Sequence, residues 1–215
     1  MIIDNNLDMW ADRFPDTLVP RVIQLVLGSW KTFKTIQTRE VPITQEFSVV
    51  LNRNQEFLKL PFIIDIEIIL LNKNGKRQIG RLDLRFIHGH LKKVYFSMEC
   101  KRLRTKSSRG KLNTLAGKYV TEGMYRYFGQ YAQDLTKGGM LGYVMDGKVD
   151  KSIEDVRKAI ESRRSDLYME QDGTLCNCSI LSSGQVKETF HKYGPNEKFT
   201  IYHIFLPMDV TPNTN

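Results

Sequence analysis

Three strand patterns in succession constrain the fold of this chain more than any other feature. Residues 62–71 form an apolar run interrupted by only two acids, which is typical of a buried strand. An Asn-Gly pair at 74–75 follows and favours a tight turn. Residues 77–86 alternate polar and apolar side chains, and residues 91–101 are rich in large β-formers. We therefore expect a three-stranded antiparallel meander.

Helical patterns lie on both sides of this meander. Apolar residues recur at helical spacing over 17–36 and 42–54, and again over 118–135. An apolar stretch at 140–145 reads as a further strand, and we expect the glycines at 138–139 to end the helix before it. The order helix, three strands, helix, strand predicts an α/β fold in which helices flank a mixed central sheet.

The last third of the chain predicts a helix and a β-hairpin. The helix is expected over 152–167 with Ser152 as its N-cap, and the strands over 187–193 and 198–207. At 215 residues the chain fits one domain. We divide this domain into N-terminal helices (17–54), a core (62–145) and a C-terminal elaboration (146–208), with a frayed tail at 209–215.

Three charged residues of the meander have a spacing that suits metal chemistry. Glu99 and Lys101 lie two apart on one strand and therefore face the same way, and Asp83 lies on the preceding strand. An antiparallel hairpin would bring all three together. Carboxylates are natural ligands of Mg²⁺, and a lysine beside them can position a nucleophile. The alternative is a solvated salt-bridge face on the sheet.

An Asp followed by Glu-x-Lys at the end of an apolar strand resembles the PD-(D/E)XK nuclease superfamily. The matching residues are Asp83, Glu99 and Lys101, with Cys100 as the x, and no proline precedes Asp83. The resemblance covers residues 40–145 and implies a restriction-endonuclease-like core. It further implies Mg²⁺-dependent hydrolysis of DNA phosphodiesters, with Mn²⁺ able to substitute. Asp83, Glu99 and the Cys100 carbonyl would hold the metal, and Lys101 would orient the attacking water.

The resemblance also implies a glutamate from the helix before the strands. Glu40 precedes that predicted helix and Glu46 lies one turn into it, and we choose Glu40 as the site residue. Alternatively, both acids simply stabilise the helix N-terminus. In the helix after the strands, we expect Glu122 and Arg126 to form an internal salt bridge.

A run of cations follows the predicted active strand, with no acid between Lys101 and Lys118. Serines and a glycine loosen its middle, so we expect a loop that contacts phosphates and becomes ordered on nucleic acid. The alternative is a solvated loop. The expected phosphate contacts are Arg102, Arg104, Lys106, Arg109, Lys111 and Lys118.

Composition narrows the class of protein and of partner. The net charge of +8 favours a polyanion, with nucleic acid ahead of a membrane surface. No apolar run is long enough to span a bilayer, and three cysteines do not form a secreted disulfide framework, so we expect a cytoplasmic protein. Cys176 and Cys178, with His191 and His203, also invite a zinc interpretation, but their spacing better fits one buried strand face.

The sequence therefore predicts a DNA-cutting nuclease, in restriction, antiphage defence, recombination or repair. DNA is preferred over RNA because the resembled superfamily mostly cuts DNA and because no aromatic base-stacking motif for RNA is visible. Two alternatives remain: a catalytically silent module that binds nucleic acid or a partner, and an accessory subunit activated by a partner protein. A homodimer is expected if both DNA strands are cut.

Overall fold

The computed structural model describes residues 14–54, 59–60, 62–71, 74–76, 78–88, 94–129, 135–170, 173–193 and 198–208. The statements below refer to these residues. Residues 91–93 of the third expected strand, residues 130–134 of the helix expected over 118–135 and the tail at 209–215 lie outside them. No helix in this part of the chain is both long and apolar enough to cross a membrane.

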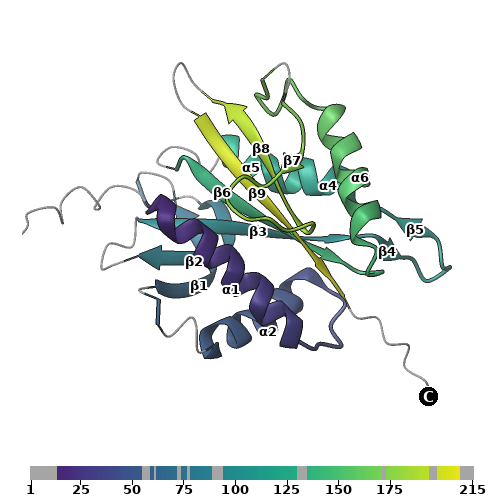
Figure 1. Cartoon of the computed structure of the whole chain (residues 1–215), viewed down its shortest axis with the longest axis horizontal. Helices are drawn as coiled ribbons and strands as arrows, with labels where there is room; N and C mark the ends of the chain where they lie inside the picture. Colours follow the sequence, from purple (N-terminus) through teal and green to yellow (C-terminus); the bar gives the residue numbers. More distant parts are fainter. Residues whose placement is uncertain are drawn as a thin grey trace, which may run out of the picture.

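A seven-stranded mixed sheet runs through the centre of the molecule, in the order β1-β2-β3-β6-β9-β8-β7 (Figure 1). Its first three strands pair antiparallel in sequence order, so the predicted meander is confirmed. The middle of the sheet, β3-β6-β9, is parallel. The strands are β1 (Phe62–Leu71), β2 (Gln78–His88), β3 (Tyr95–Leu103), β6 (Lys137–Val144), β7 (Cys176–Asn177), β8 (Val186–Lys192) and β9 (Lys198–Pro207).

Helices cover both faces of the sheet, and each face has its own apolar core. One core packs against α1 (Val19–Thr32), which follows the 3₁₀ turn η2 (Asp16–Leu18), and against α2 (Glu40–Arg53). The other packs against α6 (Val149–Glu161) and a continuous helical segment, which runs as α4 (Ala116–Lys118), η3 (Tyr119–Met124) and α5 (Tyr125–Gly129). The expected mixed sheet flanked by helices is therefore present.

Several predicted helix boundaries are wrong for local reasons. The first helix stops at Thr32 because Phe33 has an extended backbone, with ψ of 129°. The second begins at Glu40, so this acid is the first residue of α2 instead of preceding it. The last begins at Val149, and Ser152 is buried inside it instead of capping it.

Gly138 and Gly139 do not end a helix but lie inside β6. A Cβ at Gly138 would collide with the ring of Tyr127, and one at Gly139 would lie 2.8 Å from Met98 Cγ. The glycines therefore let the strand pack closely against side chains on both faces.

The C-terminal hairpin completes the central sheet. β8 and β9 pair antiparallel as expected, and β9 also pairs in parallel with β6 over the whole length of that strand. The residues expected to elaborate a core that ends at residue 145 thus supply three of the seven sheet strands.

Candidate active site

The site lies where the side chains of β2 switch from one face of the sheet to the other. Leu84 packs in the core beside α1 and α2, but Leu82 packs in the opposite core. Side chains two apart in a regular strand point the same way, so β2 is irregular at Asp83. The pairing of β2 with β3 ends at Leu84 and Met98, one residue away. Beyond this pair the two strands separate, and Asp83 lies at the opening.

The neighbouring strand β1 is irregular at the same level. Ile66 packs against the core beside α1 and α2, and Ile68 packs against the core on the opposite face of the sheet. Glu67 between them has a positive φ of 52°, which a residue with a side chain adopts rarely. Irregularities of this kind re-aim side chains within sheets and are frequent beside functional sites.

Asp83 takes the place of a backbone acceptor at the opening. Its Oδ2 accepts a hydrogen bond from the Cys100 N–H at 2.8 Å. The Nζ of Lys101 lies 3.8 Å from this oxygen and 3.6 Å from Glu99 Oε2. The structure thus brings Asp83, Glu99 and Lys101 together as the sequence predicts.

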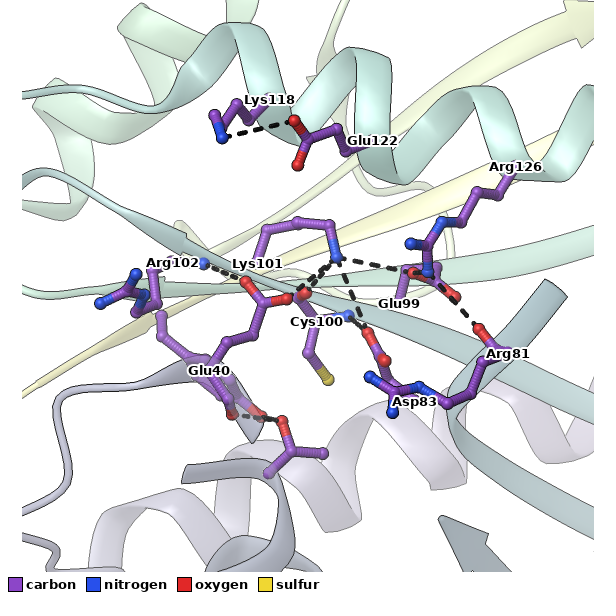
Figure 2. Close-up of polar contacts among 12 residues, drawn as sticks. Glu40, Arg81, Asp83, Glu99, Cys100, Lys101, Arg102, Lys118, Glu122 and Arg126 are labelled. Carbon is purple, nitrogen blue, oxygen red and sulfur yellow. Dashed lines mark hydrogen bonds and ion pairs between the residues drawn. The ribbon is translucent and has the colours of Figure 1, made fainter. Parts of the chain in front are cut away.

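Lys101 lies at the centre of the cluster (Figure 2). Its Nζ donates to Glu40 Oε1 at 3.1 Å and to the Cys100 carbonyl at 2.8 Å, and its side chain is only 8% exposed. Burial by itself lowers the pKa of Lys101, but the charges of Asp83, Glu40 and Glu99 outweigh burial and raise this pKa above its ordinary value. Lys101 is therefore a cation at neutral pH.

Glu40 belongs to the cluster and Glu46 does not. The Oε2 of Glu40 accepts the backbone N–H of Arg102 at 3.1 Å, so α2 is tied to the end of β3. The carboxylate of Glu46 accepts hydrogen bonds from Thr35 and Gln37 instead. These bonds fix the segment between α1 and α2.

Arg126 enters the site although sequence reasoning assigned it elsewhere. Its Nη1 lies 2.7 Å from Glu99 Oε2, and Glu122 pairs instead with Lys118 at 3.4 Å. The expected salt bridge from Glu122 to Arg126 is thus wrong. The reason is that η3 is a π-helix, whose wider turn changes which side chains share a face.

Gly123 lets this π-helix lie directly on the site. A Cβ at Gly123 would collide with Met140 Cε and lie 3.5 Å from Lys101 Cγ. A single π-turn inside a helix is often found at functional positions. The periodicity of the sequence does not distinguish this π-helix from an ordinary α-helix.

The cluster contains carboxylate and carbonyl oxygens of the kind that bind Mg²⁺. In the part of the chain that the structure describes, no three acidic, imidazole or thiol groups are arranged to hold a metal ion by themselves. However, Mg²⁺ usually binds one or two carboxylates and completes its shell with water and phosphate oxygens. Asp83, Glu99 and the Cys100 carbonyl offer such a set. Burial and the charge of Asp83 raise the pKa of the Cys100 thiol, so the sulfur stays protonated.

The expected phosphate loop is an ordered hairpin in the structure. β4 (Thr105–Lys106) pairs antiparallel with β5 (Leu112–Asn113), and the hairpin projects from the sheet beside α6 (Figure 1). Lys106, Arg109 and Lys111 are exposed on it. The hairpin is therefore a structured cationic arm that continues the strand carrying Lys101.

Arg104 requires a correction. It was expected to contact phosphate, but its side chain is only 9% exposed and pairs with Asp146 at 2.9 Å and Asp155 at 2.6 Å. Its backbone N–H donates to the Thr114 carbonyl. Arg104 therefore anchors the base of the hairpin.

The two remaining cations lie closer to the site. The Nη1 of Arg102 donates to the Thr38 carbonyl at 2.6 Å. Lys118 is well exposed and is the last residue of α4, in the first turn of the helical segment that crosses the site.

The histidines and cysteines of the last third do not form a metal centre within the described residues. His191 and His203 are buried and both contact the Thr189 hydroxyl. The Cys176 thiol donates to the Glu188 carbonyl at 3.4 Å, and Cys178 is buried. The histidines and Cys178 belong to the core, but Cys176 is half-buried and Cys178 lies one residue beyond β7 (Cys176–Asn177), so the single buried strand face expected for the two cysteines is wrong.

Comparisons of the chain with protein-family models, curated proteins and solved structures found no significant match.

Proposed function

We propose that the protein is a metal-dependent nuclease that hydrolyses DNA phosphodiester bonds. The observation that supports this most is the convergence of Asp83, Glu99 and Glu40 on Lys101, at the point where β2 separates from β3. The element order from α2 through β6 also agrees with the restriction-endonuclease-like core that the Asp and Glu-x-Lys resemblance implies. We propose the restriction-endonuclease-like core together with the nuclease activity.

Asp83, Glu99 and the Cys100 carbonyl would hold Mg²⁺, with Mn²⁺ able to replace it. When bound, the ion would supply Lewis-acid stabilisation and a water of lowered pKa. Three carboxylates face two cationic side chains in the cluster, so the site has net negative charge that favours a divalent cation. The chain itself supplies the positioning.

Lys101 would donate a hydrogen bond to the attacking water and stabilise the charge that develops on the phosphate. Its raised pKa suits a charged donor and argues against a role as general base. Glu40 holds the lysine Nζ from the side of α2. Its second oxygen secures the strand backbone at Arg102, and both contacts limit the motion of the ammonium group.

The hairpin formed by β4 and β5 would bind the DNA backbone away from the cut. Three exposed cations on a hairpin that continues the strand carrying Lys101 can hold phosphates in register without reading bases. The side chains of this set are Lys106, Arg109 and Lys111. Restriction or antiphage defence, or recombination and repair, would use such an activity.

The test is cleavage of supercoiled plasmid by the purified chain in Mg²⁺. Lys101→Met and Asp83→Asn should each lower the nicking rate by roughly 100-fold or more, because each removes a charged group from the reacting centre. Lys158→Met is the matched control, since Lys158 is a well-exposed lysine on α6. It should cut within about twofold of wild type. Equal cutting by wild type and Lys101→Met would contradict the proposal.

One observation favours the accessory-subunit alternative. Glu99 is paired with Arg126 and Lys101, so its carboxylate is already neutralised. A chain that needs a partner to open this arrangement would be silent alone with Mg²⁺ and active when a co-encoded protein is added. A chain that binds DNA with Ca²⁺ but never cuts would instead be a binding module.

A further inference from the structure

We propose that Arg126 is a further residue of this site, a counter-ion that holds Glu99 and competes with a divalent cation for it. The inference rests on the proposed metal site and concerns how that site is loaded. Arg126 would be a positioning residue that acts through Glu99.

Glu99 is fully buried. Its side chain has no exposed surface, and an ionised carboxylate in such a position requires a cationic partner. Two cations lie near its Oε2: Arg126 Nη1 at 2.7 Å and Lys101 Nζ at 3.6 Å. Arg126 is the closer of the two, and a charge-assisted hydrogen bond of this length is strong.

Arg126 and Lys101 reach Glu99 from different elements of the fold. Figure 2 shows Arg126 extending from the helix that crosses the site, whereas Lys101 comes from the same strand as Glu99. Lys101 also contacts Glu40 and Asp83, so its charge is shared among three carboxylates. Of these two cations, Arg126 therefore makes the closer contact with Glu99 Oε2.

Helix α5 is held in place, whereas the side chain of Arg126 is partly open to solvent. Tyr127, the next residue, is fully buried, and its hydroxyl lies within hydrogen-bond distance of the carbonyls of Gly139 (2.7 Å) and Ser97 (3.1 Å). The Arg126 side chain by contrast is 33% exposed. Its Nη1 also lies 3.4 Å from the Arg81 carbonyl, a long contact that the guanidinium would give up in swinging toward solvent while the backbone of α5 stays in place.

A divalent metal ion and the Arg126 guanidinium would therefore compete for the Glu99 carboxylate. A divalent ion on Glu99 would place two positive charges beside the guanidinium, and charges at such separations interact strongly in a partly buried site. Loading the site therefore displaces Arg126 toward solvent, on the side where substrate would arrive. Removing its charge should strengthen metal binding even though it removes a contact seen in the structure.

The experiment is a titration of the full chain with Mn²⁺, in which free Mn²⁺ is measured by electron paramagnetic resonance without DNA. Arg126→Gln should lower the Kd for Mn²⁺ by about tenfold, the direction expected when a competing charge is removed. Arg126→Lys retains the charge and should stay within about twofold of wild type. The matched control is Arg157→Gln, because Arg157 and Glu154 form a pair of the same 2.7 Å length on α6. Its Kd should not change.

Unchanged or weaker binding by a folded Arg126→Gln chain overturns the inference. Should that variant not fold, Arg126→Met, which keeps the apolar stem, carries the same prediction. In the wild type, the Nε–H resonance of Arg126 should shift on addition of Mg²⁺, and the resonance of Arg157 should not. Absence of Mn²⁺ binding by every variant refutes the proposed metal site as well, whereas binding that Arg126→Gln does not strengthen refutes only the role of Arg126.

Discussion

Acidification should destabilise the fold through two buried histidines, and the size of the effect follows from how they are bonded. His191 Nδ1 contacts the Leu167 carbonyl, which can only accept, so this nitrogen carries the proton. His191 Nε2 must then accept from the Thr189 hydroxyl, whose oxygen accepts from His203 Nε2. His203 Nδ1 accepts from the Tyr119 hydroxyl. Both rings are therefore neutral, with one donor and one acceptor in use.

Burial lowers the pKa of His191 to about 4 and, with a smaller contribution from the neighbouring His191, that of His203 to about 3. An unfolded histidine titrates near 6.5, so below this pH the unfolded chain binds more protons and stability falls. The loss begins near pH 6.5 and levels off below the two folded values. At about 1.4 kcal/mol per pH unit, each histidine removes about 2–3 kcal/mol of the free energy of unfolding between pH 7 and 4.5.

The assay is urea unfolding followed by circular dichroism at several pH values from 7.0 to 4.5, for wild type and His203→Gln. The substitution lowers stability by a constant amount, and the carboxylates are common to both chains. The difference between the two stabilities should therefore shrink by about 2–3 kcal/mol from pH 7 to 4.5. Parallel pH profiles would refute the assignment of His203 as a buried neutral ring.

Three further predictions concern the elements around the site. Arg104→Met should lower the free energy of unfolding by about 3 kcal/mol, because it leaves Asp146 without its buried cation, and urea titration measures this. Gly123→Ala should cost about 1–2 kcal/mol and slow plasmid cutting, since the new Cβ must displace Met140 above the site; unaltered cutting would contradict this. Tyr143→Phe removes a buried hydroxyl bond to α2 and should cost about 1 kcal/mol with cutting unchanged, and a large loss of cutting would show that α2 depends on it.

The sequence by itself predicted the parts of the fold that depend on near neighbours. Alternation with a period of two predicts that Glu99 and Lys101 share a face, and it depends only on backbone geometry. Asp83 joins them because β2 and β3 follow one another in the sequence and pair antiparallel. The proline-containing helix that supplies Glu40 was likewise visible, although its first residue was not.

Only the tertiary structure decided the contacts between distant segments. Arg126 meets Glu99 across 27 positions, and β9 joins β6 about 60 residues later, where no local pattern selects a partner. The irregularity at Asp83 also escaped prediction, because the polar and apolar order around it continues without a break while the strand itself changes face. Packing of two separate cores against one sheet imposes that change. Local sequence therefore supplied most of the charged groups of the candidate site, and long-range packing set which of them touch.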